Sequence, residues 1–136
     1  MSEQHLTDIE LRSLPLDTRL LSALDRLEFK YCTPIQAEAL HLLLAKKDVS
    51  GQAHTGTGKT LAFLLACAQQ LLSSAQAQTV PGKPRVLILA PTRELAMQIF
   101  KDAQELLLDL PLKLALCYGG KAYEQQENSL TSRSTF

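Results

Sequence analysis

Several features that often reveal a protein's function are absent from this 136-residue sequence. Fourteen basic and fourteen acidic residues give a formal net charge of zero, so no basic excess indicates nucleic-acid binding from charge alone. A balanced charge does not exclude such a partner either. A protein that holds a few phosphates through backbone N–H groups and one or two arginines need not be basic overall.

Cysteine is scarce, and no targeting or membrane segment is visible. Cys32, Cys67 and Cys117 form no CxxC pair and have no histidine at metal-ligand spacing, which argues against a disulfide framework or a zinc site. The first residues carry no basic stretch followed by an apolar run, so we expect no signal peptide. The longest apolar run, Leu61–Ala68, is far too short to span a membrane. We therefore expect a cytoplasmic protein without a membrane partner.

What the sequence does contain is the composition of a small globular domain, with 46% apolar and 21% charged residues. Apolar residues recur at helical spacing in four places. The predicted helices cover residues 16–27, a stretch that follows Pro34, residues 59–73 and residues 93–108. We expect a loose N-terminus over residues 1–10 and a polar, frayed tail from Asn128 onward.

Short apolar segments between the predicted helices are typical of strands. They cover residues 49–53, 86–90 and 112–118. Because strands and helices alternate, the sequence predicts an α/β fold with a parallel sheet and helices packed on its faces. The continuous apolar run at 86–90 indicates a strand buried on both faces.

The strongest functional signal is a phosphate-binding loop that follows a predicted strand and opens a predicted helix. Its residues are Ala53, His54, Thr55, Gly56, Thr57, Gly58, Lys59 and Thr60. Gly56 and Gly58 let the backbone turn so that its N–H groups surround a polyphosphate, and the helix start adds a positive dipole end. Lys59 supplies a charge for the outer phosphates, and the Thr60 hydroxyl is the expected Mg²⁺ ligand.

A chance glycine-rich turn is the alternative explanation for this loop. From average composition, such a pattern is expected at roughly one position in ten thousand. The usual pattern begins with glycine, whereas Ala53 holds that place here. His54, a lone histidine in a variable position, is more simply incidental than catalytic. The pattern therefore favours nucleotide binding.

Three further segments narrow the class of nucleotide-binding protein. They are Phe29–Gln36 before the loop, Pro91–Leu95 after it, and Gly119-Gly120 at the end of the third predicted strand. With the AxTGxGKT form of the loop, this order resembles the Q motif, motif I, motif Ia and GG motif of DEAD-box RNA helicases. The resemblance covers residues 11–130 and is strongest for the bacterial RhlB type of that family. It implies an incomplete P-loop NTPase domain of the RecA-like kind, with residues 131–136 as an unrelated tail.

The resemblance also implies cofactors and roles. ATP and Mg²⁺ are the implied cofactors. Gln36 would read adenine through its amide, with Phe29 against the ring and Thr33 supporting the site. A helix-surface position is the simpler alternative for Gln36 taken alone.

The implied partner is RNA, bound through its backbone and therefore without sequence preference. The residues implied to contact it are Pro91, Thr92, Arg93, Gly119 and Gly120. Taken alone, Arg93 could equally lie in a salt bridge at a capped helix start, and Gly119-Gly120 could be a plain turn. The RhlB type further implies bacterial RNA turnover and an RNA-degrading complex, contacted through parts not present here.

The sequence contains neither the Asp-Glu-Ala-Asp nor the Ser-Ala-Thr motif of that family, and no second RecA-like domain. Lys59 supports phosphoryl transfer in the family, but no complete catalytic set is present, because that reaction needs all parts together. We expect a truncated, frameshifted or designed fragment of a helicase, of marginal stability and with unpaired sheet edges. A non-catalytic nucleotide- or RNA-binding fragment and another P-loop class, such as a small kinase, are the alternatives.

Overall fold

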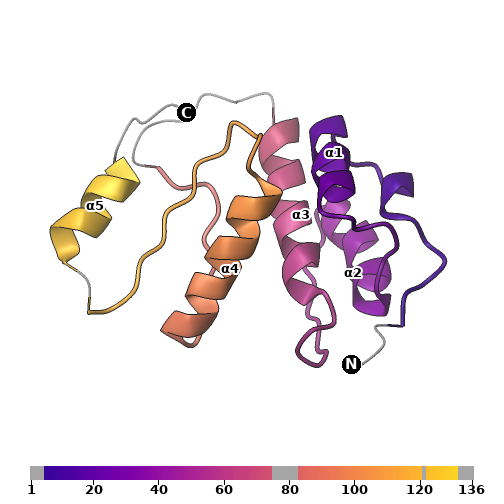
Figure 1. Cartoon of the computed structure of the whole chain (residues 1–136), viewed down its shortest axis with the longest axis horizontal. Helices are drawn as coiled ribbons and strands as arrows, with labels where there is room; N and C mark the ends of the chain where they lie inside the picture. The colour runs from indigo at the N-terminus through magenta and orange to yellow at the C-terminus, as the bar shows by residue number, and fades with distance from the viewer. Residues whose placement is uncertain (1–4, 75–82, 121, 132–136) are drawn as a thin grey trace.

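The computed structural model describes residues 5–74, 83–120 and 122–131, and the regular structure in these ranges is helical (Figure 1). The elements are η1 (Leu11–Ser13), α1 (Thr18–Arg26), α2 (Pro34–Leu44), α3 (Lys59–Ser73), α4 (Arg93–Leu106) and α5 (Tyr123–Thr131). The four helices predicted from the sequence are confirmed, each with its start within two residues of the expected position.

Local capping chemistry explains where these helices begin. The Asp17 side chain accepts the backbone N–H of Arg19 over 2.9 Å at the start of α1. Thr92 Oγ1 accepts the backbone N–H of Leu95 over 3.2 Å at the start of α4. Pro34 is the first residue of α2, where its missing N–H carries no cost.

The core lies among the first four helices. α3 contacts α2 on one side and α4 on the other, and α1 contacts both α3 and α4 (Figure 1). The most deeply buried large side chains come from η1, the four helices and the segment before α2: Leu11, Leu20, Leu24, Cys32, Leu40, Leu65 and Leu106. The helix that follows the phosphate loop is therefore the central element of the packing.

Backbone hydrogen bonds pair residues 7–11 with residues 30–32. The Thr7 N–H donates to the Cys32 carbonyl over 2.8 Å, and the Cys32 N–H donates to the Ile9 carbonyl over 2.8 Å. This pairing holds the start of the described chain next to the segment that leads into α2. The domain boundary at residue 10 stays a prediction.

The predicted parallel sheet is not formed within the described residues. The segments 49–53, 86–90 and 112–118 are assigned neither helix nor strand, and the single β-bridge found among the described residues joins Glu10 and Tyr31. A strand is defined by its hydrogen bonds to a neighbouring strand, so an apolar run remains an irregular connection where no partner lies beside it. The prediction of three paired strands was wrong for this reason.

The predicted frayed tail also needs a correction. Helix α5 covers Tyr123–Thr131, so it includes Asn128, where the tail was expected to begin. The Gln and Glu residues of α5 are good helix formers even though the segment has no apolar stripe. Residues 132–136 lie outside the described residues.

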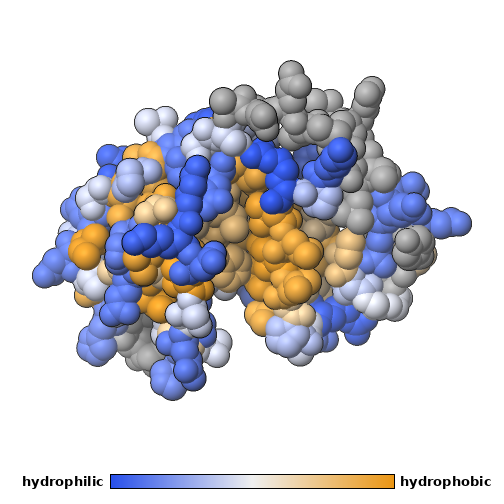
Figure 2. Space-filling view, turned by 180° about the vertical axis from the view of Figure 1, so that it is seen from behind, coloured by the Kyte–Doolittle hydropathy of each residue, from blue (hydrophilic) through white to orange (hydrophobic). Residues whose placement is uncertain are grey.

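Apolar side chains that a sheet would cover are exposed. Leu87 is 78% exposed and Leu89 is 82% exposed. Figure 2 shows hydrophobic side chains gathered in the middle of the rear face, with hydrophilic ones to either side. Among the described helices, none has both the length and the apolar character needed to cross a membrane.

Replacing Leu87 and Leu89 together by lysine is expected to reduce self-association, because the two side chains are exposed and lie in an unpaired apolar segment. Sedimentation velocity at several concentrations measures the change. Helix content by circular dichroism should stay the same, since neither side chain belongs to the buried core. Undiminished association of the double variant would contradict this expectation.

The cap of α1 predicts a pH dependence. Hydrogen bonds from the Arg19 side chain and then its backbone N–H lower the pKa of Asp17 to about 2. The unfolded-state pKa is about 3.9, so the stabilisation is complete above about pH 4 and is lost as the pH falls through about 2. Asp17→Asn keeps the capping oxygen but removes the charge. Urea unfolding should show a wild-type advantage at pH 7 that shrinks by pH 2.5, and a constant difference would contradict the assignment.

Candidate nucleotide-binding site

The predicted phosphate loop is a tight turn at the start of α3. Gly58 is the cap residue and adopts a left-handed conformation with φ 87° and ψ 15°, and Gly56 has φ 82°. Thr57 Oγ1 donates to the His54 carbonyl over 2.7 Å and closes the turn. Left-handed backbone at two positions carries little steric cost only because both are glycine.

Gln36 is a buried bridge between the first turn of α2 and the phosphate loop. Its Oε1 accepts the backbone N–H of Thr33 over 3.0 Å, and its Nε2 donates to the Gly58 carbonyl over 3.1 Å. The residue is only 3% exposed. The alternative that Gln36 lies on a helix surface is therefore wrong. The two motifs that the sequence analysis singled out separately meet through this side chain.

Thr33 is also buried against the loop. It forms a capping box with Gln36. The Thr33 N–H donates to Gln36 Oε1 over 3.0 Å, whereas the contact of Thr33 Oγ1 with the Gln36 backbone N–H does not meet the geometry of a hydrogen bond. Thr33 Oγ1 is buried with no hydrogen-bond partner among the described residues. A Cβ placed on Gly58 would lie 3.0 Å from this oxygen, so the hydroxyl faces the loop. A buried hydroxyl without a partner costs about 1–3 kcal/mol, and a polar ligand group could recover that energy.

Lys59 and Thr60 stand on the first turn of α3 and are both half-buried. The Lys59 ammonium donates to the Ala53 carbonyl, across the mouth of the loop. The described residues contain no group of three His, Cys, Asp or Glu side chains that could hold a metal ion.

Phe29, predicted to lie against the adenine ring, is 45% exposed. Its backbone N–H donates to the Leu24 carbonyl over 2.9 Å, which fixes the chain at the end of α1. Within the described residues, no hydrogen bond or ring contact joins Phe29 to the phosphate loop. The structure therefore brings Gln36 and Thr33 to the loop, and its contacts do not place Phe29 there.

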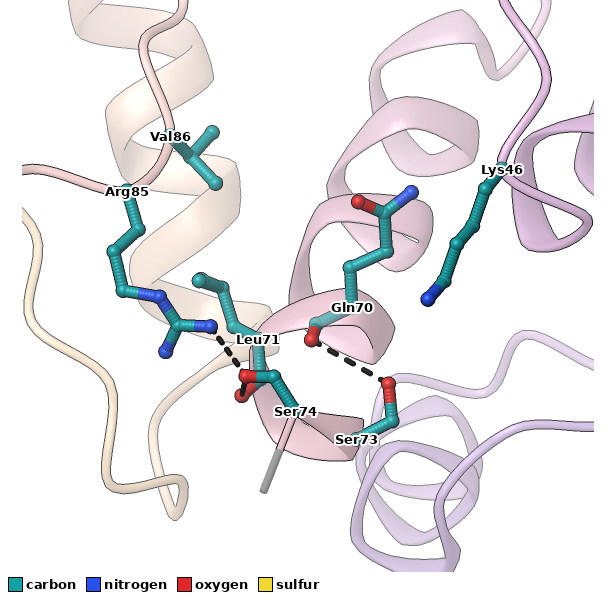
Figure 3. Close-up of a pocket in the computed structure, with 7 residues that line it drawn as sticks. All are labelled: Lys46, Gln70, Leu71, Ser73, Ser74, Arg85 and Val86. Carbon is teal, nitrogen blue, oxygen red and sulfur yellow. Dashed lines mark hydrogen bonds between the residues drawn. The ribbon is translucent and has the colours of Figure 1, made fainter. Parts of the chain in front are cut away.

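A separate cavity of about 270 Å³ lies at the other end of α3 (Figure 3). The Arg85 side chain donates to the Ser74 hydroxyl, and the Lys46 side chain stands on the opposite side of the cavity. None of the predicted nucleotide-binding residues lines it. The cavity is therefore distinct from the candidate site.

The predicted RNA contacts gather at the start of α4. The Arg93 guanidinium lies over the Tyr118 ring, 5.6 Å from its centroid. Gly120 has φ 86°, and a Cβ placed there would lie 3.8 Å from Arg93 Nη1. Thr92 caps the same helix. Figure 1 shows the amino ends of α3 and α4 on the same edge of the molecule.

Arg93 and Gly120, two of the five residues predicted to contact RNA, are thus neighbours in space although they are distant in sequence. Pro91 and Gly119 are exposed and adjoin this cluster along the chain. Tyr118 was not among the residues predicted from the sequence to contact RNA. The signal available in the sequence was the position of this tyrosine directly before the two glycines. An aromatic ring that lies beside an arginine offers a cation–π surface.

Comparison with known proteins decides the family. The family described as DEAD/DEAH box helicase matches residues 33–135. The chain belongs to the DEAD/DEAH box helicase family. The matched range runs past residue 130, where the sequence analysis placed the end of the resemblance.

Curated relatives of this DEAD-box chain agree with the family assignment. An "ATP-dependent RNA helicase RhlB" from Shewanella piezotolerans is 50% identical over 131 residues, which are 96% of this chain and 30% of the relative. The chain thus spans about 30% of the length of the curated relatives it matches. The resemblance to the RhlB type is confirmed.

Solved structures confirm the fold class. A DEAD-box protein from Methanococcus jannaschii has a TM-score of 0.76 and 31% identity, covering 90% of this chain and 32% of that protein. The RNA helicase Prp28 from Chaetomium thermophilum, solved with ADP, has a TM-score of 0.73 and 34% identity. That match covers 93% of this chain and 30% of Prp28. The helices therefore have the arrangement of this family even where the strands are unpaired.

The two loop glycines make a matched test of the Gln36 contact. Gly56→Ala should cost about 1–2 kcal/mol of unfolding free energy from left-handed backbone alone. Gly58→Ala should cost more, because its Cβ would lie 2.4 Å from Gln36 Nε2. Urea unfolding measures both.

The control for this pair is the Gln36→Ala background. Without the amide, the excess cost of Gly58→Ala over Gly56→Ala should fall, and the part that remains should come from the 3.0 Å approach of the new Cβ to Thr33 Oγ1. An excess that survives unchanged would show that Gln36 does not set the requirement for glycine at 58.

Proposed function

We propose that this chain carries the ATP-binding loop and part of the RNA-binding surface of an ATP-dependent RNA helicase of the RhlB type. The observation that carries the proposal is the Gln36 bridge to the Gly58 carbonyl, since it joins a base-reading side chain to the phosphate loop. The likeness to relatives described as ATP-dependent RNA helicases supports it.

The nucleotide would bind at the start of α3. Backbone N–H groups of residues 53–60, the helix dipole and the Lys59 ammonium would hold the phosphates. The Thr33 hydroxyl and the Gln36 amide supply polar groups beside them, and Phe29 would border the base. Prp28, which shares this fold, was solved bound to ADP, and this supports nucleotide binding by such a fold.

A Mg²⁺ ion bound with the nucleotide would neutralise phosphate charge, and Thr60 is the residue of this chain that would hold it. Lys59 supports phosphoryl transfer by placing positive charge on the outer phosphates. The chain contains no Asp-Glu-Ala-Asp sequence to orient an attacking water. We therefore propose nucleotide binding, and not turnover, as the property of these residues by themselves.

RNA would bind along the edge where α4 begins. Arg93 offers a planar guanidinium suited to a phosphate, and the amino end of α4 adds its dipole. Gly119 and Gly120 expose backbone, and Thr92 and Pro91 adjoin them. Such contacts position a strand without reading its sequence.

The whole protein would act in bacterial RNA turnover in the cytoplasm. An RNA-degrading complex is the proposed partner, because relatives named RhlB are 50% identical to this chain over the 30% to 32% of their length that it covers. The contacts with that complex would lie in parts of the protein beyond these residues. A non-catalytic nucleotide- or RNA-binding fragment is the second candidate, favoured by the absence of the Asp-Glu-Ala-Asp sequence.

Isothermal titration with ATP·Mg²⁺ and GTP·Mg²⁺ tests the proposal. The unsubstituted chain should bind ATP more tightly than GTP. Gln36→Ala should reduce that preference by up to about tenfold, the value of a hydrogen bond of about 1.5 kcal/mol. Lys59→Ala should weaken both nucleotides, because it removes a charge-assisted contact.

Gln104→Ala is the matched control, since it removes the same side chain from an exposed position on α4. It should leave both affinities unchanged. Phosphate release should stay at background for every variant. No heat of binding from a folded sample at millimolar ATP would overturn the nucleotide site, and turnover abolished by Lys59→Ala would overturn the non-catalytic reading of this chain.

A further inference from the structure

Arg93 is held by an aromatic ring rather than by a carboxylate. Its guanidinium lies 5.6 Å from the centroid of the Tyr118 ring. The nearest acid, Glu94, is 4.0 Å away at the limit of an ion pair, and both side chains are largely exposed. An exposed pair of this kind contributes little, whereas a cation over a ring is attracted to the negative face of the ring. The ring is therefore the stronger of the two contacts.

The contact fixes the guanidinium without neutralising it. Arg93 remains 55% exposed, so its charge stays available to a ligand. An arginine side chain loses rotamer entropy when it is immobilised. A ring that restrains it before the ligand arrives reduces the part of this cost that falls on binding.

Tyr118 is itself held in place. Its backbone N–H donates to Gln126 Oε1 of α5 over 2.8 Å. On the glycine side, a Cβ at Gly120 would lie 3.8 Å from Arg93 Nη1, so the guanidinium stands beside bare backbone. The planar group is thus bordered by the Tyr118 ring and by the turn at Gly120, which limits its orientations.

We propose that Tyr118 is a positioning residue that orients the Arg93 guanidinium toward a phosphate of a bound RNA strand. The inference rests on the proposed RNA contact of Arg93 and adds the residue that prepares it. A planar fork must be aligned with phosphate oxygens to make paired hydrogen bonds, so orientation determines affinity. Gln126 supports the arrangement through the backbone of Tyr118.

The test compares Tyr118→Phe, which keeps the ring, with Tyr118→Leu, which removes it. Fluorescence anisotropy with fluorescein-labelled decauridylate measures the RNA Kd at several salt concentrations. Tyr118→Phe should stay within about twofold of the unsubstituted chain. Tyr118→Leu should weaken binding about two- to fivefold, the equivalent of 0.5–1 kcal/mol.

A double-mutant cycle separates positioning from a general structural effect. Arg93→Ala should lower the salt slope by about 0.7, as expected for one lost contact to single-stranded RNA. In that background Tyr118→Leu should add nothing, because there is no guanidinium left to orient. Lys101→Ala, which removes an exposed positive charge from the same helix, is the control and should leave the effect of Tyr118→Leu intact.

A ligand-free readout tests the contact directly. The Arg93 Nε–H proton should show an upfield ring-current shift by NMR in the unsubstituted chain and in Tyr118→Phe, and lose it in Tyr118→Leu. If Arg93→Ala weakens RNA binding but Tyr118→Leu does not, only the positioning role is overturned. If the unsubstituted chain binds no RNA, the proposed RNA contact falls together with this role. The ATP titration judges the nucleotide site separately.

Discussion

The two hydrogen bonds of the Gln36 side chain are the constraint on which the rest of the site depends. They join the Thr33 N–H at the start of α2 to the Gly58 carbonyl at the start of α3. A buried amide that lost one of these partners would be left with an unsatisfied group at a cost of about 1–3 kcal/mol. The two helices are therefore held at a common end. Their packing below that point, with Leu40 and Leu65 fully buried, supports the geometry of the loop.

The sequence predicted the helices well because each helix start is encoded locally. Asp17 and Thr92 are caps whose oxygens reach N–H groups only a few residues ahead, and Gly58 provides the left-handed turn before Lys59. These interactions need no other part of the fold. The same argument explains why helix α5 was not predicted. Its residues favour a helix by propensity, but its sequence has no apolar stripe and no clear capping signal that would indicate one.

Strands and side-chain contacts were harder to predict because they are non-local. The run 86–90 has the apolar content of a buried strand, yet within the described residues it pairs with no strand, and Leu87 and Leu89 are exposed. Gln36 could be named from its motif, but its partner at Gly58 lies 22 residues away. The contact between Arg93 and Tyr118 likewise follows from how the chain returns after α4, which the spacing of the motifs does not reveal.

The internal hydrogen bonds of the loop leave some of its hydrogen-bonding groups and its lysine charge available for the proposed ligand. Gln36 uses one lone pair and one N–H internally, and in the proposed nucleotide site its remaining donor and acceptor would face the N7 and N6 groups of adenine. The Lys59 ammonium contacts the Ala53 carbonyl, which carries only a partial negative charge. A polyphosphate carries full charges at the same helix end, and charge-assisted hydrogen bonds are roughly twice as strong as neutral ones. In the proposed nucleotide site, Lys59 would exchange the Ala53 carbonyl for a phosphate oxygen while the Gln36 bonds hold the loop in place.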